Sequence, residues 1–212
     1  MTERFTYRKP SRAEAQALVA RMTTFHRQLL DCVKLIGALH EDVTLTVKGI
    51  HAGADPRAAN AAYVRTVFSL VEGALSNMCA LLVEGQAVWG WQLTPDETRI
   101  LWDATPEPTV PRPPGGHATM TERTKQVFKT GRELFGDHCT VDFSGVDFRA
   151  FRDSVLVRDR LTHPKRSADL EVTRDELAAA DRGRDWFRAG AKLYYEAGQQ
   201  TLMDILKVLK RP

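Results

Sequence analysis

The residues best suited to chemistry in this 212-residue chain lie in one stretch, residues 149–166, which reads RAFRDSVLVRDRLTHPKR. Six basic side chains stand there against two acidic ones, beside one histidine. The basic residues are Arg149, Arg152, Arg158, Arg160, Lys165 and Arg166. An imidazole, whose ordinary pKa is about 6.5, exchanges protons at neutral pH, and a guanidinium holds a phosphate with two donors. The stretch therefore supplies the groups for cleaving a phosphodiester without a metal ion.

Helical geometry separates the two central groups of this stretch. Arg158 and His163 are five positions apart, so on a regular helix they point about 140° away from each other. They meet if the helix frays before Pro164 and His163 turns towards Arg158, or if two chains meet across a twofold axis. The plain structural alternative is a solvated cationic helix end that complements the helix dipole and stops at the His-Pro step.

Motifs for several other chemistries are absent from the sequence. It contains no glycine pattern of a nucleotide-binding loop, no HExxH and no Glu-x-x-His. Cys32, Cys79 and Cys139 are widely spaced and form no CxxC pair, so we expect reduced, mostly buried thiols. Arg65 and Glu72, seven apart on one predicted helix, are interpreted as a structural ion pair, with a part in catalysis as the alternative. We predict no metal site and no cofactor.

Composition places the chain among ordinary soluble proteins. Hydrophobic residues make up 43% and charged residues 27%, which excludes disordered and fibrous classes. The formal net charge of +3 allows a polyanionic partner without requiring one. No secretory signal and no uninterrupted apolar run of membrane-spanning length is found. We therefore predict a cytoplasmic protein with no membrane contact.

Apolar residues at helical spacing predict an all-α bundle of four or more helices. The first helix follows the capping-box pair Ser11 and Glu14 and reaches residues 37–40. A second long helix begins at Pro56 and continues to about Val83. Further helices are predicted from Pro95 over Ile100 and Leu101, over residues 121–135, from Ser144 or Asp147 to just before Pro164, and from Thr173 almost to the C-terminus.

Three segments depart from the helical pattern. Alternation of β-branched residues over 43–47 (VTLTV), and the sequence CTVDF over 139–143, predict two short strands that could form a ribbon. Residues 104–118 are rich in proline and glycine and are predicted to form an exposed loop. We expect one helical domain over residues 1–212, with an N-terminal helical extension over 11–40.

The string RDRLTH, residues 158–163, resembles the R-x(4-6)-H motif of the HEPN superfamily, in its form with Asn or Asp after the arginine. Pro164-Lys165, directly after the motif, also resembles the sequence at this position in bacterial members of the superfamily. The helix that carries YVRTVFSLVEGAL, residues 63–75, is similar to the long helix of such proteins. The resemblance covers about residues 55–209, and the RDRLTH string is its specific part. The predicted fold is therefore an HEPN-like helical bundle.

The resemblance implies a homodimeric, metal-independent endoribonuclease with a toxin, antiviral or RNA-processing role. His163 would be the general acid or base, Arg158 would stabilise charge on the phosphorus, and Asp159 would orient the pair. The attacking group would be the RNA's own 2′-hydroxyl, which DNA lacks, and the site would be built from two protomers. An antitoxin or a nucleotidyltransferase would be a further partner. The RNA backbone would be held by Arg152, Arg160, Lys165 and Arg166.

Two alternatives remain open from the sequence. Some HEPN proteins bind a nucleotide, RNA or a partner protein without cleaving it, so a non-catalytic HEPN-like binding module is the chief one. The other is a helical interaction protein whose basic stretch is only a solvated helix end. The N-terminal helix, the ribbon and the proline-rich loop do not belong to the minimal family pattern.

Overall fold

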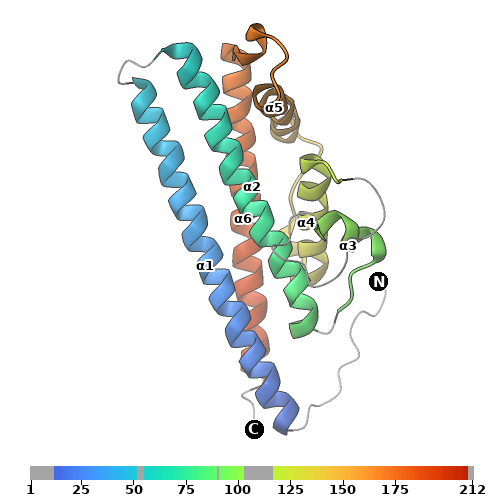
Figure 1. Cartoon of the computed structure of the whole chain (residues 1–212). Coiled ribbons are helices and arrows are strands. Elements are labelled where there is room, and N and C mark those ends of the chain that lie inside the picture. The colour runs from blue at the N-terminus through green and yellow to red at the C-terminus, as the bar shows by residue number, and fades with distance from the viewer. Residues whose placement is uncertain (1–11, 52–54, 90, 103–116, 210–212) are drawn as a thin grey trace. The chain divides into compact units, whose positions relative to one another are not determined.

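A computed structural model describes residues 12–51, 55–89, 91–102 and 117–209 of the chain (Figure 1). Within these ranges it contains helices and no strand, which confirms the predicted all-α bundle. The HEPN-like character of that bundle stays a prediction. The elements are α1 (Arg12–His51), α2 (Pro56–Trp89), α3 (Pro95–Trp102), α4 (Met120–Phe135), the 3₁₀ turn η1 (Asp137–Cys139), α5 (Val146–Thr162), the 3₁₀ turn η2 (Ser167–Leu170) and α6 (Arg174–Leu209).

The predicted strand over residues 43–47 was wrong, because α1 continues through it to His51. Val43 is buried in the helix, and the hydroxyls of Thr44 and Thr46 donate to carbonyls one turn earlier, at 3.0 and 2.9 Å. These bonds satisfy the threonine side chains within a helix. Burial of an apolar stripe at helical spacing outweighs the β-propensity of a short segment.

The second predicted strand, residues 139–143, was also wrong. Cys139 ends η1, and the residues after it follow an irregular path. Asp142 accepts from the backbone N–H and the hydroxyl of Ser144, both at 2.7 Å, which makes a local turn. Since neither segment is a strand, the predicted ribbon does not form.

Most predicted helix boundaries agree with the structure. α4 carries a complete capping box of Thr119 and Glu122, and Thr173 with Glu176 forms the same arrangement before α6. α5 begins after Gly145, so neither of the two predicted caps is used. α2 is longer than expected and ends at Trp89. Ser11 and most of the predicted loop, residues 103–116, lie outside the described residues.

The chain divides into two compact units, and α1, α2 and α6 each contribute a segment to both. Unit 1 holds residues 1–33, 75–140 and 193–212, and unit 2 holds residues 34–74 and 141–192. The single domain over residues 1–212 stays a prediction. Each unit is described separately below.

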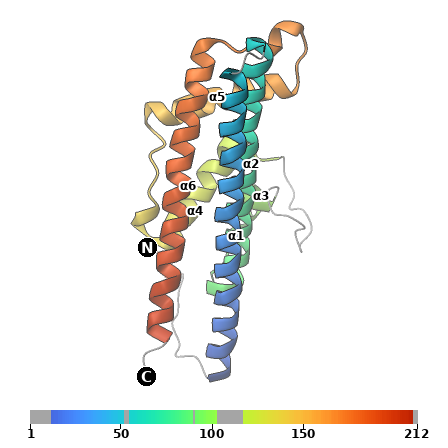
Figure 2. The same ribbon diagram turned by 90° about the vertical axis from the view of Figure 1, so that its left-hand side faces the viewer.

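Unit 1 contains α3 and α4, which contact each other (Figures 1 and 2). Its core is centred on Tyr194, which is fully buried and donates its hydroxyl to the carbonyl of Met78 at 3.2 Å. The ring of Phe135 meets that of Tyr194 edge-on, with ring centroids 5.2 Å apart. A Cβ on Gly131 would lie 2.7 Å from the Tyr194 ring, so this position needs glycine for the close packing of α4 on α6.

Unit 2 contains α5, packed on its segments of α2 and α6. Phe151 of α5 contacts the rings of Phe68 on α2 and Trp186 on α6, with centroids 6.2 and 5.1 Å apart. Gly183 of α6 lies so close to the backbone of Phe151 that a Cβ at this position would be 2.7 Å from the Phe151 Cα. The indole N–H of Trp186 donates to the carbonyl of Asp142 at 3.0 Å. These contacts fix the first half of α5.

Part of α2, Pro56–Val83, is the one stretch in the described chain that is long and apolar enough to cross a membrane. In the structure, 56% of its apolar window is buried, and Val64, Val71 and Met78 have no exposed surface. The core helix of a soluble protein has the same composition. The apolar surface of α2 is thus used in packing against the other helices.

Gly183→Ala should lower the free energy of unfolding by about 1–3 kcal/mol, because the added methyl group must push α5 and α6 apart. Gly37 is the matched control: it also lies within a helix, and a Cβ there meets nothing within 4 Å. Gly37→Ala should raise the free energy of unfolding by up to about 1 kcal/mol, through helix propensity alone. Urea denaturation followed by circular dichroism measures both changes. Effects of equal sign and size would contradict the close packing of α5 on α6.

Candidate functional site

The candidate site lies in unit 2, at the C-terminal end of α5. The helix ends at Thr162, as Pro164 predicts, and His163 is the first residue beyond it, with φ −124° and ψ 58°. The backbone N–H of His163 still donates to the carbonyl of Asp159, at 3.0 Å. The His163 side chain is exposed, and its imidazole has no hydrogen bond or ion pair with the described residues. A general acid or base at this position is open to solvent.

Arg158 points towards α2, where its guanidinium forms an ion pair with the carboxylate of Glu72. A second carboxylate, that of Asp159, accepts from the same guanidinium at 2.9 Å. The Arg158 side chain is 24% exposed. The helix does end before His163, but in the described chain Arg158 is bonded to two carboxylates and has no hydrogen bond with that imidazole. Within one chain, the two motif residues are therefore not bonded to each other.

Arg65 and Glu72 do not pair with each other, contrary to the sequence-based interpretation. Arg65 donates to the carbonyl of Leu161 at 2.9 Å, and Glu72 accepts from Arg158. Each of the two α2 residues is thus bonded to the last turns of α5. Their spacing of seven placed them on one face of the helix, but it did not identify α5 as the element that this face contacts.

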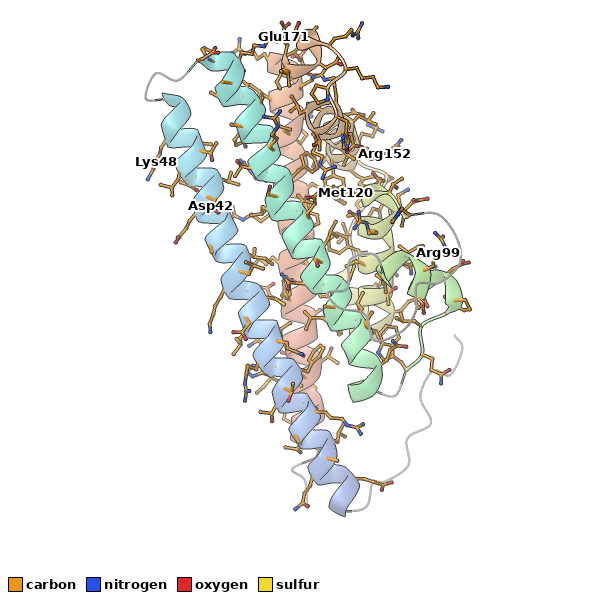
Figure 3. The ribbon with its side chains drawn as sticks, viewed as in Figure 1. Asp42, Lys48, Arg99, Met120, Arg152 and Glu171 are labelled. Atoms are coloured by element: carbon orange, nitrogen blue, oxygen red, sulfur yellow. The ribbon has the colours of Figure 1, made fainter. Side chains whose placement is uncertain are left out.

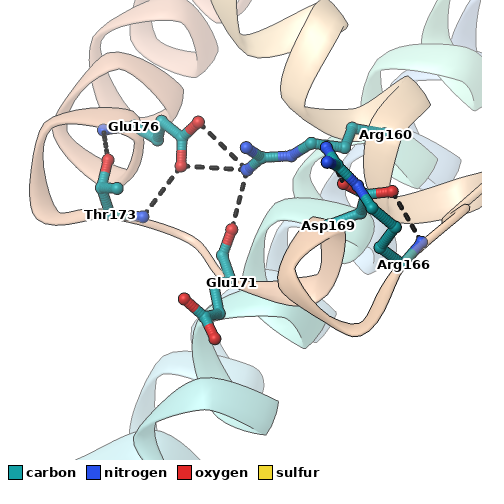
Figure 4. Close-up of polar contacts among 6 residues, drawn as sticks. All are labelled: Arg160, Arg166, Asp169, Glu171, Thr173 and Glu176. Carbon is teal, nitrogen blue, oxygen red and sulfur yellow. Dashed lines mark hydrogen bonds and ion pairs between the residues drawn. The ribbon is translucent and has the colours of Figure 1, made fainter.

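Arg160 joins the end of α5 to the start of α6 (Figure 4). Its guanidinium donates to the carbonyl of Glu171 at 2.8 Å and to the carboxylate of Glu176 at 3.0 Å. Burial by itself would raise the pKa of Glu176, but the Thr173 N–H and the Arg160 guanidinium together hold the pKa below its ordinary value. Arg160 therefore has a structural role, whether or not it also contacts a ligand.

Lys165 and Arg166 lie in the turn between α5 and η2, which Asp169 organises. The Asp169 carboxylate accepts the backbone N–H of Lys165 at 2.8 Å and that of Arg166 at 2.9 Å, and these bonds lower its pKa. The Arg166 guanidinium lies 3.5 Å from Asp169, but its side chain is 81% exposed (Figure 4). Both basic side chains are thus directed to solvent from an ordered turn.

Arg152 is the remaining predicted RNA-binding residue. Its side chain projects outward from α5 (Figure 3) and is exposed. It has no hydrogen bond or ion pair with the described residues. The four predicted backbone-binding residues therefore divide into two that bond to carboxylates, Arg160 and Arg166, and two that do not, Arg152 and Lys165.

The three thiols lie in unit 1 and take no part in this site. Cys32, Cys79 and Cys139 are free and buried, as the sequence predicted. Burial raises the pKa of the Cys79 and Cys139 thiols to about 12, so both are protonated and unreactive at neutral pH. Among the described residues, no group of histidine, cysteine, aspartate and glutamate side chains is arranged to hold a metal ion.

The comparisons with known proteins provide no relative for this chain. It matches no family model, no curated protein and no solved structure. The chemistry of the site therefore has to be argued from its own residues.

Replacing Glu176 by Gln should lower the free energy of unfolding by about 1 kcal/mol at pH 7, because it removes a charge-assisted bond from Arg160. The folded-state pKa of Glu176 is lowered, so its ionised form adds stability above the ordinary value of 4.5, and this stability is lost as the pH falls through the lowered pKa. The wild type and the variant should converge in acid. Urea denaturation over that pH range tests this, and a difference that does not depend on pH would contradict it.

The ion pair of Glu72 and Arg158 should give a coupling energy of about 0.5–1 kcal/mol in a double-mutant cycle of Glu72→Gln and Arg158→Gln. The value is modest because the two side chains are 42% and 24% exposed. Free energies of unfolding of the four proteins measure it. Additive effects would mean that the pair does not form in solution.

Proposed function

We propose that this chain is a metal-independent endoribonuclease of the HEPN type, acting on RNA in the cytoplasm in a toxin, antiviral or RNA-processing role. The observation that carries the proposal is the position of His163. Its imidazole is exposed and has no partner among the described residues, directly after a helix that carries the rest of the RDRLTH motif. An exposed imidazole can exchange protons with a bound RNA.

The proposed reaction is an internal transesterification. The ribose 2′-oxygen attacks the adjacent phosphorus, the bond from phosphorus to the 5′-oxygen breaks, and the products are a 2′,3′-cyclic phosphate and a 5′-hydroxyl. One imidazole takes the proton of the 2′-hydroxyl, and an imidazolium gives a proton to the leaving 5′-oxygen. Arg158 stabilises the negative charge that develops on the phosphoryl oxygens. Atoms and protons balance without a metal or a cofactor.

Two protomers supply what one chain lacks. A single chain has one motif histidine, and its Arg158 is turned towards α2, whereas the reaction uses a base and an acid. In a homodimer with the two α5 ends facing each other, each protomer supplies one imidazole and one guanidinium. Arg152 and Lys165 then hold the RNA backbone, with the exposed Arg166 beside them and Arg160 holding the helix end in place.

The alternative function, a non-catalytic module that binds RNA, a nucleotide or a partner protein, is favoured by one observation. Arg158 is bonded to two carboxylates, those of Glu72 and Asp159, so its charge is more than balanced locally. A guanidinium that is paired with two carboxylates stabilises the negative charge of a phosphoryl transition state less well than an unpaired guanidinium. Cleavage assays decide between the two functions.

Wild-type protein should cleave a structured RNA in the presence of EDTA and leave cyclic phosphate ends. His163→Ala should abolish cleavage, and Arg158→Ala should reduce the rate by about 100-fold or more. His138→Ala is the matched control, since His138 is also exposed but lies in η1 of unit 1, and this variant should cleave like wild type. Folded proteins that all fail to cleave, or a His163→Ala variant that still cleaves, would contradict the proposal.

A further inference from the structure

The candidate site has to supply positive charge where an RNA phosphate binds. Arg158, the arginine of the motif, contacts the carboxylates of both Glu72 and Asp159. Two negative charges at hydrogen-bond distance offset one guanidinium, so the surroundings of Arg158 attract a phosphate weakly. The exposed Lys165 and Arg166 follow His163 in the chain, and α2 carries a further positive charge at this end of α5.

This further charge is that of Arg65. Its side chain is exposed, and it donates to the carbonyl of Leu161 at 2.9 Å. That partner carries no net charge, and in the described structure no carboxylate pairs with Arg65. Of its five N–H donors, one is used by the carbonyl bond, so the rest can contact a ligand. Arg65 thus keeps its full charge at the end of α5.

The carbonyl bond also places Arg65 near the proposed general acid or base. Leu161 precedes His163 by two residues, so the two Cα atoms are at most about 7.6 Å apart. A guanidinium bonded to the Leu161 carbonyl and an imidazole on His163 can therefore both reach one phosphate group. The bond restricts the arginine side chain before any ligand arrives, which reduces the entropy lost on binding.

Glu72 does not cancel this charge, although it lies on the same face of α2. It is seven residues further along, which is about 10 Å of helix rise, and its carboxylate is bonded to Arg158. The two α2 residues therefore have opposite effects on α5. Glu72 neutralises and orients the arginine of the motif, whereas Arg65 adds a charge beside the histidine.

We propose that Arg65 is a phosphate-binding residue of this site and holds the RNA phosphodiester next to His163. The proposal rests on the proposed function for the identity of the ligand. Arg65 contributes affinity for the scissile phosphate through charge-assisted hydrogen bonds, and it does so from α2, outside the RDRLTH motif. A role as a helix cap alone would require only a neutral donor to the Leu161 carbonyl.

The variant Arg65→Gln is read in two ways: the salt slope of binding reports loss of the charge, and the unfolding midpoint reports loss of the bond to the Leu161 carbonyl, because the glutamine amide is two bonds shorter than the guanidinium. The matched control is Arg188→Gln. Arg188 is an exposed arginine of α6 in the same unit, and it follows Trp186, which packs on Phe148 in the first turn of α5. It therefore lies near the opposite end of α5 from His163.

The probe is a short fluorescein-labelled RNA in which every 2′-hydroxyl is replaced by fluorine, so that it binds but cannot react. Arg65→Gln should weaken binding roughly tenfold and make the slope of log affinity against log salt shallower by about 0.7. Arg188→Gln should bind like wild type, and the unfolding midpoint of each variant should stay close to that of wild type. With unmodified RNA, Arg65→Gln should cleave more slowly at subsaturating RNA.

The outcomes distinguish this inference from the proposed function. Loss of affinity and salt dependence in Arg65→Gln alone supports the inference even if wild-type protein cleaves no RNA, in which case only the cleavage proposal fails. Wild-type affinity in Arg65→Gln overturns the inference even if His163→Ala abolishes cleavage. A wild-type protein that does not bind the probe overturns it as well.

Discussion

The attachment of α5 to α2 through Glu72 and Arg65 is the constraint on which the candidate site depends. A helix that ends at a proline leaves its last carbonyls without partners in the helix, and α5 ends in this way before Pro164. Arg65 satisfies the carbonyl of Leu161, and Glu72 anchors the side chain of Arg158 one turn earlier. Together with the bonds from Arg160 to Glu171 and Glu176, these bonds hold the last turn of α5, and that turn positions His163.

This attachment reduces the charge of the site while it fixes the geometry. Partly exposed ion pairs stabilise a fold by about 1 kcal/mol or less. The two carboxylates therefore orient the Arg158 guanidinium but can be exchanged for another anion. A phosphate that approaches Arg158 replaces one weak partner with another. In the proposed function, the carboxylates would preorganise the Arg158 side chain and weaken its attraction for a phosphate, and the charge of Arg65 would restore part of that attraction.

Local chemistry explains which parts of the fold could be predicted from the sequence. The capping box of Thr173 and Glu176 and the stop at Pro164 act within a few residues, so the boundaries they predict agree with the structure. The strand over residues 43–47 was a misreading of the same kind of local pattern, since burial of Val43 in α1 depends on packing that a five-residue window does not contain.

The candidate site shows the same division between local and distant information. Residue types alone identified Arg158 and His163 as the groups with acid–base and phosphate-binding chemistry. Glu72, the α2 partner of Arg158, is 86 residues away in the chain, and the partner of Arg65 is 96 residues away. Which face of α5 contacts α2 is decided by the packing of Phe151 on Phe68, and no spacing within either helix reveals it.

The two ends of α5 are held by different kinds of interaction, and this difference has a functional consequence. The first half is fixed by aromatic rings, with Phe148 and Phe151 packed on Trp186, where repacking would expose apolar surface. The last turns bury the smaller side chains of Val157 and Leu161, and they are also held by polar bonds to partly exposed groups, which water or a phosphate can replace at little cost. Local opening should therefore begin at the His163 end while the aromatic end stays packed. A catalytic or binding site at that end can adjust to a polyanionic ligand without unfolding the core of unit 2.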